Sequence, residues 1–308
     1  MGLRIFLTGV SGYLGSVLAE RFAREPETEG ITGIDLATPT TPLPPKVEFV
    51  KMDIRSPGLT AAMAGHEVVV HTAFIVKWMA KMPATVRDDL NLNGARNVAR
   101  AAAANKVRRF IHASSMAAYD PYLVRGETGV TEDFPIVESD SFFYYSDGKA
   151  AAERALKEVL EPSNVLLTLF RPIYIVGPYN RGTVEGFRQN TVKFPRRDPR
   201  MQFVHEEDVA SAFLQAVRTD MPGAYNVVPD DFIRMSEVWK IIGARFVPTV
   251  PLWMARLVTT VRWRYFDSPT HPSWVEAALA DFIGSNAKLR ATGWKPRYGS
   301  AEALNTAL

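Results

Sequence analysis

Leu3-Arg-Ile-Phe-Leu-Thr8-Gly9-Val-Ser-Gly12-Tyr-Leu-Gly15 is the stretch of sequence that decides the fold. Its first six residues form a short apolar run that predicts a buried strand, and the residues after Gly15 have helical periodicity. The three glycines between them follow at three-residue spacing. A strand that turns through glycines into a helix directs free backbone N–H groups and the positive end of the helix dipole to one point. That point suits a pyrophosphate.

An acidic residue after the second strand candidate supports a dinucleotide-binding turn. The apolar run 31–34 ends at Asp35, twenty residues past Gly15. A carboxylate there accepts hydrogen bonds from the adenosine ribose and repels a 2′-phosphate, so the sequence predicts NAD rather than NADP. A third candidate strand, 47–50, leads to Asp53 and Ile54, where we expect the adenine. The alternative is an ordinary turn in which Asp35 only caps a strand.

The composition fits a large α/β protein. The 308 residues are 47% hydrophobic and 22% charged, with a net charge of +3 and no cysteine. The lack of cysteine excludes disulfides and thiolate metal sites, and it agrees with a cytoplasmic location. No signal peptide is apparent, and no apolar run approaches the length of a membrane span. We therefore expect a cytoplasmic protein with no membrane span, no bound metal and no nucleic-acid partner.

Two basic segments have more than one interpretation. Residues 193–200 and 256–264 are rich in Lys and Arg, which suit an anionic substrate but also occur on solvated surfaces. The second segment overlaps an apolar stripe at helical spacing, made of Trp253, Leu257, Val261, Trp263 and Tyr265. We expect this stripe to pack against the core. A substrate lid or a membrane contact is the alternative.

Strand and helix candidates alternate over the first 170 residues. Further strands are expected at 67–73, 108–114 and 165–170, with helices at 57–64, 85–105 and 146–160. This alternation predicts an α/β fold with a doubly wound, Rossmann-type parallel sheet. We expect an NAD-binding domain of residues 1–173 and about 201–229, completed by a helix at 209–218 and a strand at 224–228. Residues 174–200 and 230–308 would form a smaller C-terminal lobe that binds the substrate.

Tyr145 and Lys149 lie four residues apart, on one face of a predicted helix. An ammonium group near a phenol lowers the pKa of the phenol, which can then exchange a proton with an alcohol or a carbonyl. The same lysine can reach the nicotinamide ribose. Ser114 and Ser115 end a strand, where a hydroxyl can hold the substrate oxygen beside the tyrosine. Proton transfer by Tyr145 and hydride transfer at the nicotinamide would complete an alcohol oxidation or a carbonyl reduction.

The order of these pieces resembles the extended short-chain dehydrogenase/reductases, the NAD-dependent epimerase/dehydratase family. The matching pieces are Thr8 to Gly15, Asp35, Asp53-Ile54, His71 to Ala73, Asn91 to Asn97, Ser114 to Tyr119, Tyr145 with Lys149, Arg171 to Pro178 and Phe203 to Val209. They cover about three quarters of the chain.

The resemblance implies roles for individual residues. Ser115, Tyr145 and Lys149 would be the catalytic trio, and Asn91 would support the active-site helix. The expected NAD contacts are Gly9, Ser11, Gly12, Tyr13, Leu14, Gly15, Asp35, Asp53, Ile54, Thr72, Ala73, Phe74, Asn91, Ser114, Tyr145, Lys149 and Pro172. The resemblance also implies a homodimer formed through the helices at 85–105 and 146–160.

Departures from the family pattern narrow the chemistry. Met116 and Ala117 stand where sugar-nucleotide dehydratases have an Asp-Glu pair, and neither side chain exchanges a proton. Tyr174 stands where sugar-nucleotide enzymes tend to have a substrate-binding asparagine, which favours similarity to hydroxysteroid and flavonol-type dehydrogenases. We expect an NAD-dependent oxidoreductase or epimerase that acts on a secondary alcohol or ketone. A sugar-nucleotide epimerase and a non-catalytic dinucleotide-binding regulator stay open as alternatives.

Overall fold

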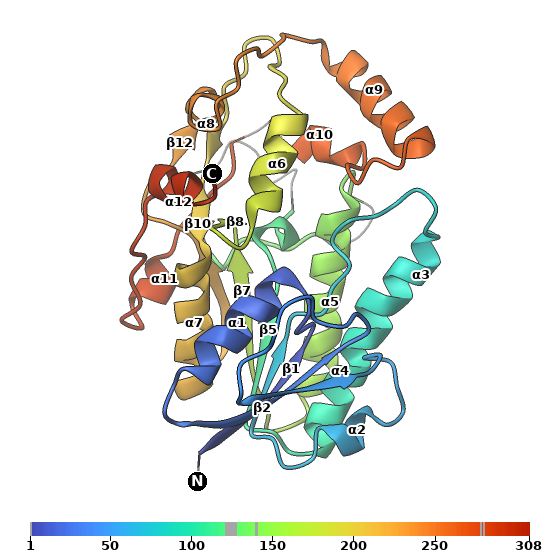
Figure 1. Cartoon of the computed structure of the whole chain (residues 1–308), viewed down its shortest axis with the longest axis vertical. Helices are drawn as coiled ribbons and strands as arrows, with labels where there is room; N and C mark the ends of the chain where they lie inside the picture. The colour runs from blue at the N-terminus through green and yellow to red at the C-terminus, as the bar shows by residue number, and fades with distance from the viewer. Residues whose placement is uncertain (1, 121–127, 139–140, 278, 280) are drawn as a thin grey trace.

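A seven-stranded sheet forms the centre of the computed structural model, which describes residues 2–120, 128–138, 141–277, 279 and 281–308 (Figure 1). All neighbouring strands are parallel, in the order β11-β7-β5-β4-β1-β2-β3. The strands are β1 (Leu3–Thr8), β2 (Thr28–Asp35), β3 (Val47–Lys51), β4 (Val68–His71), β5 (Arg109–Ala113), β7 (Leu166–Pro172) and β11 (Gly223–Val227). From β1 the chain adds β2 and β3 on one side of the sheet and then crosses to add β4 on the other side of β1. Ligands of such sheets bind at this point between β1 and β4, beyond the carboxyl ends of the strands.

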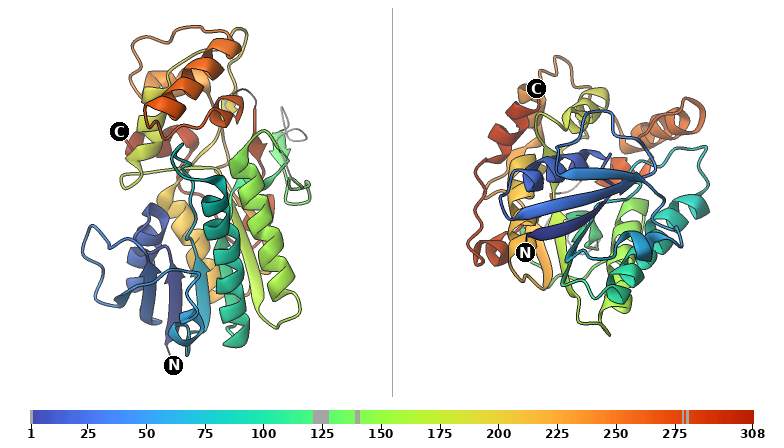
Figure 2. Two further views of the ribbon diagram at one scale, coloured as in Figure 1. Left: turned by 90° about the vertical axis from the view of Figure 1, so that its right-hand side faces the viewer. Right: turned by 60° about the horizontal axis from the view of Figure 1, so that its bottom comes forward.

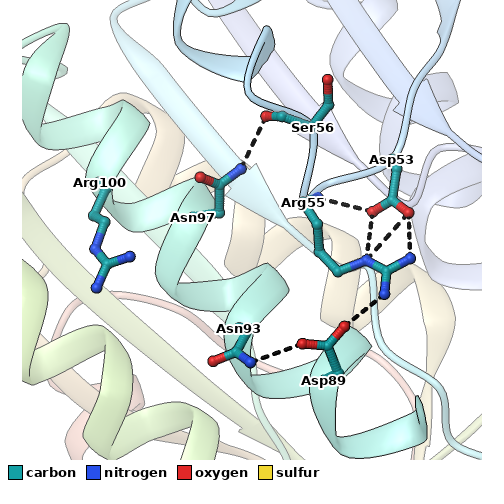
Figure 3. Close-up of a pocket in the computed structure, with 7 residues that line it drawn as sticks. All are labelled: Asp53, Arg55, Ser56, Asp89, Asn93, Asn97 and Arg100. Carbon is teal, nitrogen blue, oxygen red and sulfur yellow. Dashed lines mark hydrogen bonds and ion pairs between the residues drawn. The ribbon is translucent and has the colours of Figure 1, made fainter.

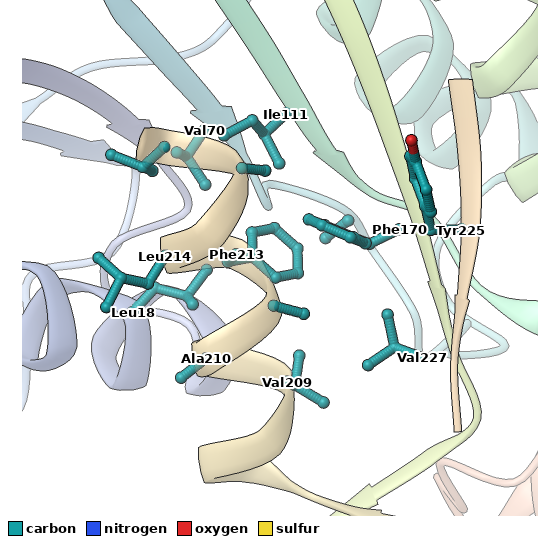
Figure 4. Close-up of a cluster of buried hydrophobic side chains, with 14 of the residues drawn as sticks. Leu18, Val70, Ile111, Phe170, Val209, Ala210, Phe213, Leu214, Tyr225 and Val227 are labelled. Carbon is teal, nitrogen blue, oxygen red and sulfur yellow. The ribbon is translucent and has the colours of Figure 1, made fainter. Parts of the chain in front are cut away.

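Helices cover both faces of the sheet, which confirms the predicted doubly wound fold. α1 (Tyr13–Ala23) and α7 (Glu206–Arg218) lie on one face, where Phe213 and Leu214 pack with Val70, Ile111 and Phe170 (Figure 4). α2 (Leu59–Ala62), α4 (Gly94–Ala104) and α5 (Tyr144–Leu160) lie on the other face, with α4 and α5 side by side (Figure 2).

The helix expected at 85–105 is divided into three parts. α3 (Ala84–Asp88) is followed by a π-helical turn, η1 (Asp89–Asn93), and then by α4. Such a turn adds one residue to a helical repeat and is frequent at functional sites. Here it contains Asn91, whose side chain is buried. Periodicity alone does not reveal the interruption.

The remaining elements lie mainly above the carboxyl ends of the strands, as Figure 1 shows. They are β6 (Thr128–Val130), β8 (Tyr174–Val176), α6 (Arg181–Gln189), β9 (Arg200–Met201), β10 (Phe203–His205), β12 (Ile233–Arg234), α8 (Met235–Ile241), α9 (Leu252–Tyr265), α10 (Ser273–Ala277), β13 (Ile283–Gly284), α11 (Ala287–Arg290) and α12 (Ser300–Thr306). Much of this lobe has a hydrophobic cluster of its own. Leu289 and Trp294, however, pack in the core cluster of the sheet. The exact division into domains stays a prediction.

The apolar stripe of α9 does not pack as expected. Trp253, Leu257, Val261 and Tyr265 are all exposed, with 64%, 55%, 38% and 76% of their surface accessible. Of the stripe, Trp263 lies inward, and its indole N–H donates to the carbonyl oxygen of Trp78 at 2.7 Å. The expectation of core packing was therefore wrong for four of the five residues, because helical spacing identifies an apolar face without saying what it faces.

A buried ion pair fastens α5 to the sheet. The Arg171 guanidinium at the end of β7 donates two hydrogen bonds to Glu153, from Nε at 2.8 Å and from Nη2 at 2.6 Å. The Ser114 hydroxyl donates to the same carboxylate at 2.5 Å. Arg171 also lies over the ring of Tyr119, 4.6 Å from its centre. Glu153 is completely buried, so its charge depends entirely on these partners.

Replacement of Glu153 tests the contribution of this pair to stability. We expect Glu153→Ala to lower the free energy of unfolding by about 3–5 kcal/mol, because it leaves the Arg171 charge buried without its partner. Urea denaturation followed by circular dichroism measures the change. Glu158→Ala on the same helix is the matched control, because this side chain is exposed and lies 3.7 Å from Arg96. Equal effects of the two substitutions would contradict the assignment.

Candidate active site

The turn after β1 is closed so tightly that two of its glycines have no room for a side chain. Gly9 has a φ of +78°, and a Cβ there would lie 2.7 Å from the backbone nitrogen of Ala73. A Cβ on Gly15 would lie 2.0 Å from the carbonyl oxygen of Gly9. Gly12 is exposed at the start of α1. The turn therefore brings helix and strand together and leaves the Gly12 backbone open to a ligand.

The first turn of α1 offers backbone donors. Gly12 is its N-cap residue and makes no side-chain capping bond, so the first N–H groups of the helix point outward with the positive end of the dipole. The side chains of this turn face elsewhere: Leu14 packs against the core, and the Tyr13 hydroxyl donates to Glu206 at 2.9 Å. This arrangement of bare backbone donors fits a pyrophosphate.

Glu206 connects the same turn to the upper lobe. Its carboxylate also accepts from the backbone N–H of Tyr179 at 3.2 Å, and a Cβ on Gly177 would lie 2.3 Å from it. Glu206 is buried, and burial is the main cause of the raised pKa of both Glu206 and Tyr13.

Asp35 lies at the end of β2, beside the glycine turn. Its two carboxylate oxygens accept hydrogen bonds from the backbone N–H groups of Ser11 and Ala37, each at 3.1 Å. A carboxylate has about four acceptor positions, so this one can still accept from ribose hydroxyls. The position fits the ribose contact that we expect.

Asp53 lines a polar groove of about 520 Å³ near the end of β3 (Figure 3). Arg55 holds its carboxylate, with Nη2 at 2.6 Å, and the same guanidinium reaches Asp89 at 2.6 Å. The hydrogen bond from Arg55 is the main cause of the lowered pKa of Asp53. The backbone oxygen of Ile54 accepts from Asn97 at 2.7 Å. The adenine contacts of Asp53 and Ile54 stay a prediction, since the Asp53 carboxylate already has a cationic partner.

The segment that follows β4, residues 72–75, is held by β1 on one side and by Asn91 on the other. The Thr72 hydroxyl donates to the carbonyl oxygen of Thr8 at 2.7 Å, and the Ala73 N–H lies 3.4 Å from the Thr8 hydroxyl. Asn91 holds the backbone of Ile75 by two bonds, accepting from its N–H at 2.7 Å and donating to its carbonyl oxygen at 3.2 Å. The Asn91 amide therefore supports this segment, which leads to Phe74 and Trp78.

The predicted catalytic trio comes together at the carboxyl end of β5. Ser115 lies close enough to Tyr145 to lower the pKa of its phenol. The Ser115 hydroxyl also accepts from the N–H of Ala117 at 3.1 Å, at the start of a short turn of 3₁₀ helix, η2 (Met116–Ala118). The Lys149 ammonium lies 5.8 Å from the centre of the Tyr145 ring. It donates to the carbonyl oxygen of Ala113 at 2.8 Å and lies 3.8 Å from the centre of the Phe74 ring.

Burial controls the titration of both Tyr145 and Lys149. It raises the pKa of Tyr145 to about 12, against the opposing effect of the Ser115 hydrogen bond. It lowers the pKa of Lys149 to about 7. The sequence predicted that the lysine would lower the pKa of the phenol. Desolvation outweighs that attraction here, because neither charged form is solvated and the ammonium group is not in contact with the hydroxyl.

The two remaining predicted contacts lie close to this trio. Ser114 is buried, and its hydroxyl is bonded to Glu153, so its side chain has a supporting role in the structure. Pro172 ends β7 and is paired with Val227 of β11. Both positions lie at the edge of the sheet where the coenzyme is expected.

Aromatic rings enclose Tyr145, and sequence reasoning missed most of them. Trp274 of α10 stacks on the Tyr145 ring with centres 5.6 Å apart, and Phe143 contacts both rings. Phe74 meets Tyr145 edge-on at 6.0 Å. The Trp274 indole N–H donates to the hydroxyl of Tyr144 at 3.2 Å. Trp274 is distant from Tyr145 in sequence, so no local pattern pointed to it.

Two buried histidines lie behind the trio. His71 and His112 are aligned on β4 and β5, with ring centres 5.1 Å apart, and the Lys149 charge acts on both. Burial lowers the pKa of His71 to about 3 and that of His112 well below its usual range. Within the described residues, both ring nitrogens of His112 lack a hydrogen-bond partner. These imidazoles are neutral packing groups, and the described chain contains no cluster of ligands suited to a metal ion.

Comparisons with known proteins agree with this geometry. A model of the NAD dependent epimerase/dehydratase family matches residues 5–227. An uncharacterized protein of Mycobacterium tuberculosis is 22% identical over 314 residues, which cover 98% of this chain and 82% of that protein. Sterol-4-alpha-carboxylate 3-dehydrogenase (decarboxylating) of Candida albicans is 27% identical over 198 residues, 60% of this chain and 54% of that enzyme.

Solved structures share the fold. The structure of UDP-glucose 4-epimerase from Thermotoga maritima with UDP-glucose superimposes with a TM-score of 0.77 and 17% identity, covering 99% of this chain and 97% of that chain. Among the described residues, no helix is both long and apolar enough to cross a membrane. The family model covers most of the chain and contains the glycine turn and the tyrosine–lysine helix, so the protein belongs to the NAD-dependent epimerase/dehydratase family.

Proposed function

We propose that the protein oxidises a secondary alcohol, or reduces the corresponding ketone, with NAD as coenzyme and Tyr145 as the acid/base group. The observation that carries this proposal is the position of Ser115 beside Tyr145, with Lys149 one helical turn further, at the edge of the sheet that holds the glycine turn. When bound, the oxidised coenzyme would accept the hydride of the alcohol, and NADH would supply the hydride for the reduction of the ketone.

The residues that would hold the coenzyme follow from the fit of the site. The backbone N–H groups at Tyr13, Leu14 and Gly15 would bind the pyrophosphate, which the missing side chain of Gly12 lets approach, and Asp35 would bind the adenosine ribose. Ser11, Asp53 and Ile54 would lie along the adenosine half. Gly9, Thr72, Ala73, Phe74, Asn91, Ser114 and Pro172 would shape the floor below the nicotinamide half, and Lys149 would donate to its ribose.

The chemistry belongs to Tyr145 and Ser115. Ser115 orients the substrate oxygen, and Tyr145 exchanges its hydroxyl proton as the carbon loses or gains a hydride. With a pKa of about 12, the phenol is protonated near neutral pH in the free protein, which is the form that donates a proton to a ketone oxygen. Met116 is buried and Ala117 is apolar, so neither assists a dehydration.

The surroundings of Tyr145 favour a substrate with an apolar body. Phe74, Phe143 and Trp274 surround the phenol, and Tyr174 is packed between Phe187 and Phe203. In the basic segment 193–200, Arg200 is held by Asp281, while Lys193, Arg196 and Arg197 are exposed. These three cations support the alternative of an anionic group on the substrate.

Epimerisation is the second candidate. It needs the same three residues and returns the hydride to the other face of a retained ketone, and the likeness to UDP-glucose 4-epimerase supports it. A non-catalytic regulator is disfavoured, because the serine, tyrosine and lysine are all retained. A cytoplasmic location and a homodimer formed through α4 and α5 stay predictions, which cell fractionation and light scattering would test.

Replacement of the phenol by phenyl tests the catalytic assignment. We expect Tyr145→Phe to bind NAD with unchanged affinity and to lose about 10²–10⁴-fold in turnover, because proton exchange is lost. Turnover is followed by NADH absorbance and product stereochemistry, with a panel of steroid alcohols, flavonols and sugar nucleotides. NADH release indicates a dehydrogenase, and inversion without release indicates an epimerase.

The neighbouring tyrosine provides the control for this experiment. Tyr144 has its hydroxyl bonded to the carbonyl oxygen of Val76 at 2.7 Å. Tyr144→Phe should keep turnover within a few-fold of the wild type. Full turnover in Tyr145→Phe would remove this residue from the mechanism. A failure of the wild-type protein to bind NAD would reject the coenzyme proposal as a whole.

The lowered pKa of Lys149 predicts a pH-dependent stability. The folded value is about 7 and an unfolded lysine titrates near 10.4, so unfolding takes up a proton between these values. The free energy of unfolding should therefore rise with pH over this window, by up to about 1.4 kcal/mol per unit. Urea denaturation at several pH values measures it. Lys149→Met should lose this rise in the free energy of unfolding, and Lys157→Met, at an exposed position, should keep it. The same dependence on pH in the wild type and both variants would contradict the prediction.

A further inference from the structure

Helix α9 presents its apolar stripe to solvent. Trp253, Leu257, Val261 and Tyr265 recur every four residues and are all exposed, so they form one continuous outward face. Val258, at 49% exposure, widens this face. Ala255, the helix residue that is fully buried, and the partly buried Leu252, Thr259 and Trp263 lie on the opposite side. The helix therefore has a second apolar side besides the one that packs against the protein, whereas an ordinary surface helix is polar on the side away from the core.

The charges of α9 are all of one sign. Arg256, Arg262 and Arg264 lie within Leu252–Tyr265, and this segment has no Asp or Glu. Helical geometry places Arg262 beside the Val258 edge of the exposed apolar face, and Arg264 at an angle between Trp253 and Leu257, within that face. An apolar face with tryptophan and leucine, bordered by arginines, is typical of helices that lie in the interface of a membrane with anionic lipids.

The position of α9 allows contact with a flat surface. The helix forms an outer edge of the upper lobe and projects from the rest of the molecule in the right-hand view of Figure 2. Phe266, directly after the helix, is 73% exposed and extends the apolar area at this end.

We propose that α9 docks the protein onto the surface of a phospholipid bilayer that contains anionic lipids, with its apolar stripe at the level of the headgroups. Charge complementarity favours this occupant over a second copy of the chain. Two copies that met through α9 would bring Arg262 and Arg264 of one copy against the same arginines of the other, with no acidic residue of the helix between them. Anionic headgroups neutralise these arginines, and the interface accommodates Trp253 and Tyr265.

Flotation with lipid vesicles tests the proposal on the full-length protein, without NAD or substrate. We expect binding to vesicles of phosphatidylcholine mixed with phosphatidylglycerol, weaker binding to phosphatidylcholine alone, and release by added salt. The double variant Leu257→Ser, Val261→Ser should lower the affinity by about tenfold or more, because it removes apolar area from the docking face. Arg262→Gln with Arg264→Gln should also weaken binding by about tenfold and reduce its salt dependence.

The control is an exposed aromatic residue of the same lobe outside α9. Phe232 is 44% exposed, and Phe232→Ser should bind vesicles like the wild type. All variants change exposed side chains, so matching thermal transitions and circular dichroism spectra show that the fold is kept. The readout is independent of turnover, so loss of the catalytic proposal leaves this one standing.

Three results would overturn the proposal. The first is that the wild type does not bind anionic vesicles. The second is that the wild type and both α9 variants bind them equally. The third is that the wild type forms a dimer in the absence of vesicles and the Leu257→Ser, Val261→Ser variant does not. The last result would assign the face to a second copy of the chain. Analytical ultracentrifugation of the same preparations provides this measurement.

Discussion

The buried ion pair between Glu153 and Arg171 sets the geometry on which the candidate site depends. Glu153 lies one helical turn after Lys149 and two turns after Tyr145, so the pair that fastens α5 to β7 also sets the depth of both candidate catalytic groups. Ser114 connects the same carboxylate to the end of β5, next to Ser115. Burying the charges of Glu153 and Arg171 costs free energy unless each charge keeps its hydrogen-bond partners. This requirement favours the one position of α5 in which Glu153 meets both Arg171 and Ser114.

Local sequence patterns predicted the fold because its main elements carry local signals. The glycine turn, the alternating strands and helices and the acid after β2 all follow from spacing within about thirty residues. The meeting of Ser115, Tyr145 and Lys149 also followed, since parallel strands and their following helices bring such residues to one edge. The π-helical turn at Asn91 was missed, because one extra residue hardly alters an apolar pattern.

Other features depend on long-range packing and were not predictable. Trp274 reaches Tyr145 from a segment more than a hundred residues away, and the outward face of α9 is apolar in the same way as a buried one. The pKa of Tyr145 is shifted opposite to the expected direction, because it depends on burial rather than on spacing, and burial also lowers the pKa of Lys149. A sequence pattern can predict which groups lie near one another, but it does not predict how deeply they are buried, and burial shifts their pKa values.

The contact between Tyr13 and Glu206 has a mechanical consequence. Tyr13 opens the helix that faces the expected pyrophosphate, whereas Glu206 sits against Gly177 and accepts from Tyr179, where the chain passes into the upper lobe. A displacement of that crossing either stretches the phenol–carboxylate bond or carries the glycine turn with it. The hydrogen bond between Tyr13 and Glu206 therefore links the position of the glycine turn to that of the segment by which the chain enters the upper lobe.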